Sequence, residues 1–261
     1  MTIAEKITRA KNDLDEVYTA GYEKGKAEVI PSGDYSEGFT AGKKAEYDAF
    51  WGTYQDNGNR TMYVNGFGGS GWTNETFNPP FDMYPTSAYM MFRYCEVTGD
   101  LVEILSRLGR TLDFSNCTGM QYTFNITKFT RVGVIDCTAI SGTLDNTFAS
   151  SQNLETIDKL ILKNDGSTAF GNTFGTCKSL KNITIEGTIG KSVSFKDSPL
   201  TADSAISVIN HLKSFHGASD AYSQTLTFST STWDALGALG AAAPDNTTWR
   251  YYVEQELAWN T

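Results

Sequence analysis

The sequence predicts an α+β fold in which N-terminal helices are followed by a short β-solenoid and a C-terminal cap of helix and strand. One pattern, apolar-x-apolar-x-x-Cys-x-x-apolar, occurs at residues 112–120 and 132–140, and residues 160–165 repeat its start with aspartate in place of cysteine. A second element is copied at an offset of 26, because residues 147–157 match residues 173–183 position by position. Self-similarity with a period of about 20–29 residues is typical of a leucine-rich solenoid.

The apolar and cysteine positions of these repeats predict the core of the solenoid. Alternate strand residues, such as Val132 and Val134, are expected to point inward and stack on the neighbouring coils, while cysteine, serine, asparagine or aspartate satisfies backbone groups at the turn. The chain has four cysteines, which are Cys95, Cys117, Cys137 and Cys177. They form no Cys-x-x-Cys pair and have no histidine nearby, so we expect buried, reduced ladder residues and no metal site.

Residues 1–55 are predicted to be helical and to join copies of the chain or attach it to a larger assembly. Their first apolar residues follow a 4-3-4-3-4 spacing, which fits about three heptads of coiled coil. Residues 18–28 are then repeated as residues 35–46, and the Pro-Ser-Gly-Asp break between the copies makes an antiparallel hairpin within one chain the alternative. Close helix packing would compensate the glycines, which cost about 1 kcal/mol each in a helix. The residues expected at the oligomer interface are Ile3, Ile7, Leu14, Val17, Gly21, Gly25, Gly38 and Gly42.

Residues 56–91 show the sharpest shift in composition, with many glycines and aromatic residues and no clear period. We interpret this segment as a collar that caps the N-terminal end of the solenoid, because a terminal coil must be shielded from water. Its aromatic side chains, Trp72 and Phe77 among them, allow a second interpretation, which is stacking on sugar rings. The glycines do not predict a phosphate loop, because no Gly-Lys-Ser/Thr follows them.

The solenoid is assigned to residues 92–200, and residues 201–261 are assigned to the C-terminal cap. Thr201 is predicted to be the N-cap of an amphipathic helix. Residues 225–230 restore the strand pattern, and residues 232–239 predict a further short helix.

Composition and charge narrow the classes of function. A chain of 261 residues, of which 40% are hydrophobic, has enough apolar material for a core. The net charge is −9 and the basic residues are scattered, so nucleic acid is not an expected partner. No apolar run approaches the roughly 20 residues that span a bilayer, and the first residues lack the apolar stretch of a secretory signal. We expect a protein made in the cytoplasm, without membrane insertion.

Residue patterns that indicate catalysis are nearly absent. The only histidines, His211 and His216, lie on or just after one predicted helix and have no paired nucleophile. Carboxylates are numerous, but their spacing singles out no acid and base pair. The sequence therefore predicts a protein that is not an enzyme and needs no cofactor.

The motif Phe-x-x-Cys/Ser-x-x-Leu-x-x-Ile at residues 148–157 and 174–183 resembles the BspA-type leucine-rich repeats of bacterial surface proteins. Four further segments are similar to a subgroup that phages and prophages of gut Firmicutes often encode, namely residues 2–6, 41–51, 57–61 and 198–201. The resemblance covers most of the chain. It implies a virion-associated protein of the phage tail tip or tail fibre, made in the bacterial cytoplasm, that displays a repeat domain to a host surface.

We accordingly expect a non-enzymatic receptor-binding or adhesion module. Its expected partners are a host cell-surface protein or glycan, other virion tail proteins and further copies of the chain. Residues between the inward apolar pair of each coil should project outward. They predict a concave strip that consists of Asp113, Ser115, Gly133, Ile135, Ile161, Lys163, Thr184, Glu186, Ser194 and Lys196. Two alternatives are a structural tail or baseplate component with no cell ligand and a cell-wall glycan hydrolase.

Overall fold

The computed structural model describes residues 54–55, 61–62, 67–68, 72–75, 77–79, 82–240 and 242–261. The chain divides into two compact units, Met1–Gly52 and Thr53–Thr261, and the described residues all belong to the second. The predicted helical segment therefore lies outside the described residues, except for Tyr54–Gln55, which form a strand. The eight residues predicted at an oligomer interface, from Ile3 to Gly42, also lie outside them.

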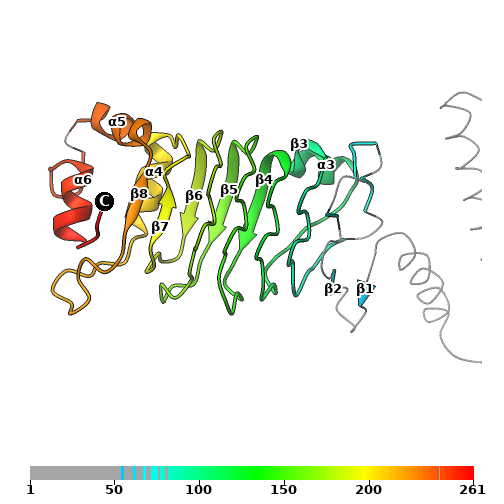
Figure 1. Ribbon diagram of the computed structural model, residues 1–261, viewed down its shortest axis with the longest axis horizontal. Coiled ribbons are helices and arrows are strands. Elements are labelled where there is room, and N and C mark those ends of the chain that lie inside the picture. The colour runs from blue at the N-terminus through cyan, green and yellow to red at the C-terminus, as the bar shows by residue number, and fades with distance from the viewer. Residues whose placement is uncertain are drawn as a thin grey trace, which may run out of the picture. The chain divides into compact units, whose positions relative to one another are not determined.

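The second unit contains a parallel β-solenoid whose elements are labelled in Figure 1. Strands β1 (Tyr54–Gln55) and β2 (Thr61–Met62) form a short antiparallel ribbon. Strands β3 (Thr98–Asp100), β4 (Lys128–Asp136), β5 (Thr156–Ile161) and β6 (Asn182–Glu186) form a parallel sheet in chain order. A second parallel pair consists of β7 (Val193–Phe195) and β8 (Leu226–Phe228). The helices are α3 (Leu101–Arg107), α4 (Ala202–Asn210), α5 (Thr230–Ala238), α6 (Trp249–Tyr251) and the π-helical turn η1 (Tyr252–Glu256).

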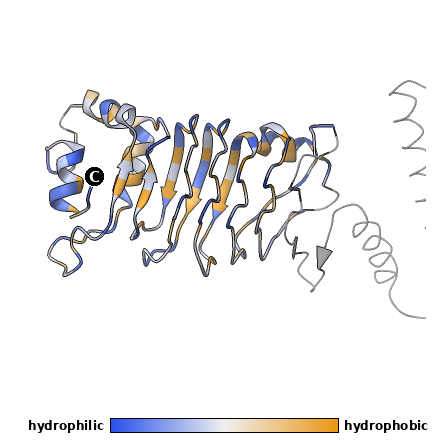
Figure 2. Ribbon diagram, viewed as in Figure 1, coloured by the Kyte–Doolittle hydropathy of each residue, from blue (hydrophilic) through white to orange (hydrophobic). Residues whose placement is uncertain are grey.

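Residues 98–186 make about three turns of this solenoid, so the predicted solenoid is confirmed. Apolar and polar residues are interspersed along its strands, as the orange and blue segments of Figure 2 show. The burial of β6 follows strict alternation, with Ile183 and Ile185 inward and their neighbours exposed. Within the described residues, no helix combines the length and apolar character needed to cross a membrane.

A column of stacked phenylalanine rings, the phenylalanine ladder, lies at the centre of the solenoid core. It consists of Phe67, Phe92, Phe124, Phe148, Phe174, Phe195 and Phe228. Consecutive ring centroids are 4.4–6.0 Å apart. The repeat with an offset of 26 is confirmed here, because Phe148 and Phe174 stack 5.7 Å apart and are within 4° of parallel.

Small polar side chains beside the ladder satisfy backbone groups between coils. The Ser151 hydroxyl donates to the carbonyl oxygen of Phe124, and the Cys177 thiol donates to that of Phe148 at 3.1 Å. The Ser198 hydroxyl continues the series by donating to the Cys177 carbonyl oxygen at 3.2 Å. These are the turn roles that the repeat predicts for serine and cysteine. All four cysteines are buried and unpaired, as expected.

A β-bulge in β4 and β5 changes which side chains of these strands point inward. The register between β5 and β6 shifts by one residue between Ile157 and Leu160, whereas β4 and β5 stay in register with each other. The extra residue of a bulge breaks the alternation, so two consecutive residues face outward. In β4 these are Gly133 and Val134, and Val134 is 52% exposed while Ile135 is 2% exposed. The predictions that Val134 points inward and Ile135 projects outward are therefore wrong.

Helix α3 is inserted into the coil that precedes β4. Strand β3 pairs in parallel with β4 only as far as Asp100, which lies opposite Arg131. The chain then enters helix α3. The Asp100 carboxylate accepts hydrogen bonds from the amides of Val102 and Glu103, at 2.8 and 3.1 Å, which makes Asp100 an N-cap. The insertion lengthens this coil and leaves the later part of β4 without a strand on the side of β3, while β5 pairs with it on the other side.

Cys117 and Cys137, in two successive coils, do not occupy equivalent positions. The Cys117 amide donates to the carbonyl oxygen of Phe114, and the Ile140 amide donates in the same way to that of Cys137. Cys117 therefore corresponds in the turn to Ile140, and Cys137 corresponds to Phe114. The prediction that Cys117 and Cys137 occupy the same ladder position is wrong, although both are buried.

Helix α4 covers the far edge of the four-stranded sheet. The Thr201 hydroxyl accepts a hydrogen bond from the Ser204 amide, so Thr201 is the N-cap, as predicted. The hydroxyls of Ser204 and Ser207 accept hydrogen bonds from the amides of Ile183 and Ile185 in β6, both at 2.9 Å. Two donors at the end of the sheet are thus satisfied by side chains of the helix, which protects the edge from pairing with another chain.

Candidate functional site

The residues of the predicted concave strip are half-buried or exposed, with the exception of Ile135. They do not lie in one row. Thr184 and Glu186 are on β6, and Ile161 is on β5. Ser194 belongs to the separate β7–β8 pair, together with Lys196, which follows it.

The first two residues of the predicted strip, Asp113 and Ser115, lie in a turn after α3. The Asp113 carboxylate accepts a hydrogen bond from the Ser115 amide at 2.8 Å. Asp136 and Thr138 repeat this contact at 2.8 Å in the next coil. Both aspartates therefore have a role in shaping turns, which the strip prediction did not include.

Paired charges occupy the outer face of the sheet. The Arg131 guanidinium contacts Asp158 through two hydrogen bonds, at 2.6 and 2.8 Å, and Asp100 through a third at 3.0 Å. Hydrogen bonds to these carboxylates, first Asp158 and then Asp100, raise the pKa of Arg131 above its ordinary value. Lys159 pairs with Glu186 at 2.9 Å. Sequence analysis missed this charged face because the bulge turns Asp158 and Lys159 outward together.

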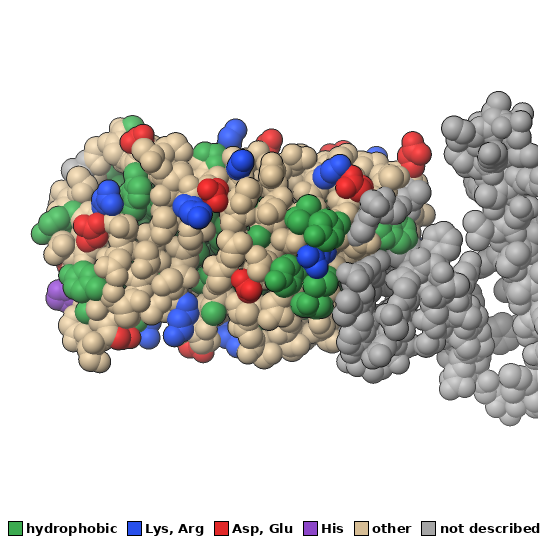
Figure 3. Space-filling model, in the orientation of Figure 1, with side chains coloured by type: hydrophobic (Ala, Val, Ile, Leu, Met, Phe, Trp, Pro, Cys, Tyr) green, Lys and Arg blue, Asp and Glu red, His purple; other side chains and the backbone are tan. Residues whose placement is uncertain are grey.

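A second candidate surface, the aromatic–arginine patch, consists of Tyr89, Met90, Arg93, Tyr94, Tyr122 and Ile126. Tyr94 and Ile126 are 45% and 38% exposed, which is unusual for large side chains so close to a core. The Tyr89 and Tyr122 rings meet edge to face with centroids 6.2 Å apart. Acidic, basic and hydrophobic side chains share the face drawn in Figure 3, where hydrophobic side chains also gather around a basic one beside the grey residues.

The patch is built on left-handed backbone. Met90, Tyr94, Tyr122 and Ile126 have φ of 57°, 61°, 59° and 57°. Bulky and β-branched residues rarely adopt this region, which costs roughly 1–2 kcal/mol per residue. Each of these residues uses the conformation to donate its amide to a carbonyl oxygen of the next coil, at 3.0–3.3 Å. The hydrogen bonds between coils hold the side chains of the patch in place.

The same left-handed positions recur in later coils with polar residues, which are Asn146, Ser150 and Thr176. Along the axis of the solenoid, the amide and hydroxyl side chains of these residues come after the side chains of the patch. Asn172 donates to the side-chain oxygen of Asn146 at 3.0 Å, so the polar part is itself connected between coils. The left-handed residues thus form two columns, one of Met90, Tyr122 and Asn146 and one of Tyr94, Ile126, Ser150 and Thr176, and both change from large side chains to small polar ones along the axis of the solenoid.

Arg93 lies between two tyrosines of the patch. Its guanidinium carbon is 4.8 Å from the centroid of the Tyr94 ring and 5.1 Å from that of the Tyr122 ring. Its terminal nitrogens donate to the Tyr94 hydroxyl at 3.3 Å and to the Met90 sulfur at 3.6 Å. The Nε atom is buried and has no hydrogen-bond partner. No carboxylate forms an ion pair with Arg93 among the described residues.

The two collar aromatics that were considered for sugar stacking, Trp72 and Phe77, pack against the ladder residue Phe67, whereas Tyr84 of the same segment is exposed. Phe77 is 3% exposed and packs against Phe67 at a centroid distance of 5.1 Å. Trp72 is half-buried and meets the same ring edge to face at 5.7 Å. These contacts favour the interpretation as a plug. The alternative of a sugar platform is wrong for Phe77, because its ring faces are covered.

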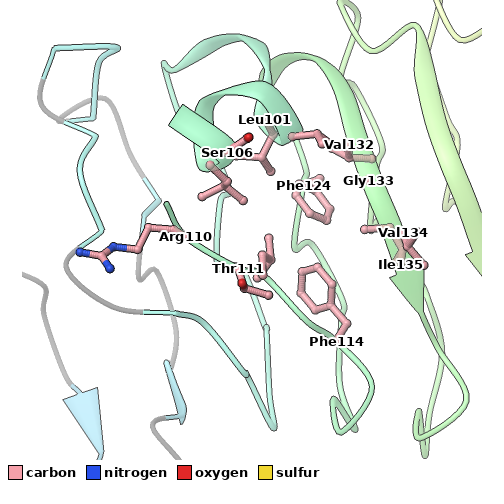
Figure 4. A pocket seen from close by; sticks show the side chains of 13 residues that line it. Leu101, Ser106, Arg110, Thr111, Phe114, Phe124, Val132, Gly133, Val134 and Ile135 are labelled. Atoms are coloured by element: carbon pink, nitrogen blue, oxygen red, sulfur yellow. The ribbon is translucent and has the colours of Figure 1, made fainter. Parts of the chain in front are cut away.

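A cavity of about 430 Å³ lies between α3 and β4, where β4 has no strand on the side of β3. Leu101 and Leu105 of the helix line one wall, and Val132 and Ile135 of the strand line the other. Figure 4 shows the Arg110 side chain directed away from this cavity. Its Nε atom donates to the carbonyl oxygen of Pro79 at 2.8 Å.

The histidines and thiols form no reactive centre within the described residues. His211 Nδ1 lies 2.7 Å from the carbonyl oxygen of Ser207, and His216 is exposed. Burial raises the pKa of the Cys117 thiol to about 11 and that of Cys177 to about 12, so both stay protonated near neutral pH and are poor nucleophiles. In this part of the chain, no group of three histidine, cysteine, aspartate or glutamate residues is placed to hold a metal ion.

No protein-family model matches the chain, and comparisons with curated proteins and with solved structures find no match either.

Proposed function

We propose that the protein is a non-enzymatic recognition module of a phage tail that displays its solenoid to a bacterial host surface. The resemblance of its repeats to BspA-type repeats supports this class of function. The aromatic–arginine patch is the observation that carries the proposal. Tyrosine, methionine and arginine are the residue types that protein interfaces concentrate, and tyrosine and arginine often supply most of the binding energy.

The patch is suited to binding because its backbone is already fixed. Its left-handed residues are held by hydrogen bonds between coils, and the buried ladder residues Phe92 and Phe124 stand between them in the chain. Side chains on a preorganised scaffold lose little freedom when a ligand binds, so more of the contact energy appears as affinity. The charges of the sheet face, by contrast, already have partners within the chain, such as Lys159 with Glu186.

Adhesion of purified, labelled protein to a panel of gut Firmicutes tests the proposal. We expect the double variant Tyr94→Ala/Ile126→Ser to lose adhesion to any strain that the unchanged protein binds. Tyr222→Ala is a matched control, because Tyr222 is also exposed and has a left-handed φ of 62°. The charge reversal Lys163→Glu/Glu186→Lys tests the strand face separately. Failure of the unchanged protein to adhere to any strain would contradict the proposal.

A structural role in the tail is the second candidate. Leu239 and Tyr251 are exposed in the C-terminal cap and offer an apolar contact to a neighbouring virion protein. This role predicts incorporation into tail particles without adhesion to cells. Tail particles produced with the Leu239→Ser/Tyr251→Ser variant would then not contain the protein, while the Tyr94→Ala/Ile126→Ser variant would be incorporated normally.

A further inference from the structure

We infer that the aromatic–arginine patch binds an acidic sugar, whose ring packs against tyrosine and whose negative group meets the Arg93 guanidinium. This inference rests on the proposed function, and it names the ligand class and the residues that select it. A sugar presents apolar C–H faces beside hydroxyl groups, and tyrosine combines an apolar ring with a polar tip. An acidic group adds a charge that Arg93 is able to neutralise.

Arg93 provides the charge complementarity. A guanidinium has five N–H donors, of which the two terminal nitrogens hold four. These nitrogens use one donor for the Tyr94 hydroxyl and one for the Met90 sulfur, which is a weak acceptor. Two terminal donors are therefore left for a ligand. A planar guanidinium binds a carboxylate or phosphate through two such donors.

The position of Arg93 strengthens this attraction. Arg131, on the sheet face, has its charge neutralised by Asp100 and Asp158. Among the described residues, the Arg93 guanidinium contacts two tyrosine rings, a tyrosine hydroxyl and a sulfur but no carboxylate, and its Nε atom is buried without a hydrogen-bond partner. A half-buried cation without a counter-ion gains more from an incoming anion than one already paired, because burial weakens the screening by water.

The surroundings of the patch favour a sugar over an acidic peptide. Asn146, Ser150 and Thr176 continue the two left-handed columns beyond the tyrosines. Successive coils pair as parallel strands, which lie about 4.7–4.9 Å apart, a spacing close to the length of one pyranose unit in a chain. A linear polysaccharide along the axis would therefore meet an aromatic coil first and amide and hydroxyl groups afterwards.

Isothermal titration calorimetry of the full chain tests the inference with defined probes. The probes are tetragalacturonate, its neutral methyl ester, mannose 6-phosphate and a tetraglutamate peptide. We expect the unchanged protein to bind an acidic sugar, through either the carboxylate or the phosphate probe. The methyl ester and the peptide should bind about tenfold more weakly or not at all, and rising salt should weaken the acidic probes.

The variants locate the site. Arg93→Gln should weaken binding of the acidic sugar about tenfold or more, and Arg93→Lys should restore part of it. Arg250→Gln is the matched control, because Arg250 also lies over an aromatic ring, 5.5 Å from Trp233, but pairs with Glu254. A far-ultraviolet circular dichroism spectrum and thermal midpoint equal to those of the unchanged protein would show that Arg93→Gln still folds.

Three outcomes would overturn the inference. They are equal affinity of Arg93→Gln and the unchanged protein, equal affinity for the acidic sugar and the glutamate peptide, and no binding of either acidic sugar. If the protein adheres to cells and one of these outcomes is found, the sugar site is rejected while the proposed recognition function stands. If it binds the acidic sugar but adheres to no strain, the proposed function fails and the site remains.

Discussion

Phe148 lies in the middle of the phenylalanine ladder, with parallel rings 5.5 and 5.7 Å away on its two sides. We predict that Phe148→Ala lowers the free energy of unfolding by about 3–5 kcal/mol, because it opens a cavity among buried rings. Phe228 is the last ring, tilted by 44° from its neighbour, and Phe228→Ala should cost less. Guanidinium chloride unfolding measures both values. A loss as large at Phe228 as at Phe148 would contradict a continuous ladder.

We predict that the buried Cys117 thiol makes the free energy of unfolding decrease with pH in the alkaline range. Burial raises its pKa from 9.0 to about 11, so the folded chain keeps a proton that the unfolded chain has lost. The stabilisation is therefore complete below pH 9.0 and is lost as the pH rises toward about 11. We expect the difference in free energy of unfolding between the unchanged protein and Cys117→Ala to be constant below pH 9.0 and to fall by about 1.4 kcal/mol per pH unit between pH 9.0 and about 11. A difference that stays constant over the whole range would refute this origin.

At the scale of the element, Ser204 and Ser207 decide how the sheet ends. Each hydroxyl satisfies one amide of β6, and neither amide has a strand beside it on that edge. We predict that Ser204→Ala/Ser207→Ala destabilises the protein by about 1–3 kcal/mol for each buried amide left unpaired. Ser219→Ala, at an exposed serine of a loop, should have almost no effect. Thermal unfolding followed by circular dichroism measures this difference.

Amide hydrogen exchange distinguishes the loss of the Ser204 and Ser207 hydrogen bonds from a general destabilisation of the protein. The Ile183 and Ile185 amides should exchange faster in the double serine variant than other β-sheet amides do. Uniform acceleration across β4, β5 and β6 would instead mean that the helix contributes only general packing.

The elements differ in how far the sequence predicts them. The copy with an offset of 26 predicts the stacking of Phe148 on Phe174, because residues one coil length apart lie side by side in a solenoid. Thr201 is predicted correctly because an N-cap depends on local residues alone. The bulge in β4 is not predictable in this way, since it depends on the register of a neighbouring strand and not on the apolar pattern of Val132 and Val134.

The other error came from aligning the repeats by cysteine. Cys117 and Cys137 are 20 residues apart, whereas the turn contacts of Asp113 and Asp136 repeat after 23 residues, so the two cysteines occupy different turn positions. The aromatic–arginine patch escaped prediction for a related reason. Its tyrosines come from two successive coils, whose ladder residues are Phe92 and Phe124. These residues are 32 positions apart because helix α3 is inserted between them, so the proximity of the tyrosines depends on the length of that insertion.

At the scale of the whole molecule, the predicted role of the N-terminal segment is tested by its removal. The boundary between the two compact units falls after Gly52. We predict that the full chain is an oligomer and that a chain of residues 53–261 is a monomer, because the residues expected to pair copies all precede this boundary. Multi-angle light scattering measures both masses. Monomeric masses for both proteins would contradict the coiled coil and leave the hairpin alternative.

The phenylalanine ladder has an optical consequence. Aromatic rings fixed 4.4–6.0 Å apart in an asymmetric setting couple their electronic transitions, and such coupling vanishes when the rings rotate freely. The phenylalanine band of the near-ultraviolet circular dichroism spectrum lies at shorter wavelengths than the tyrosine and tryptophan bands. Its fine structure would therefore report the integrity of the solenoid interior directly, without any attached label, while the tyrosine band reports separately on the surface.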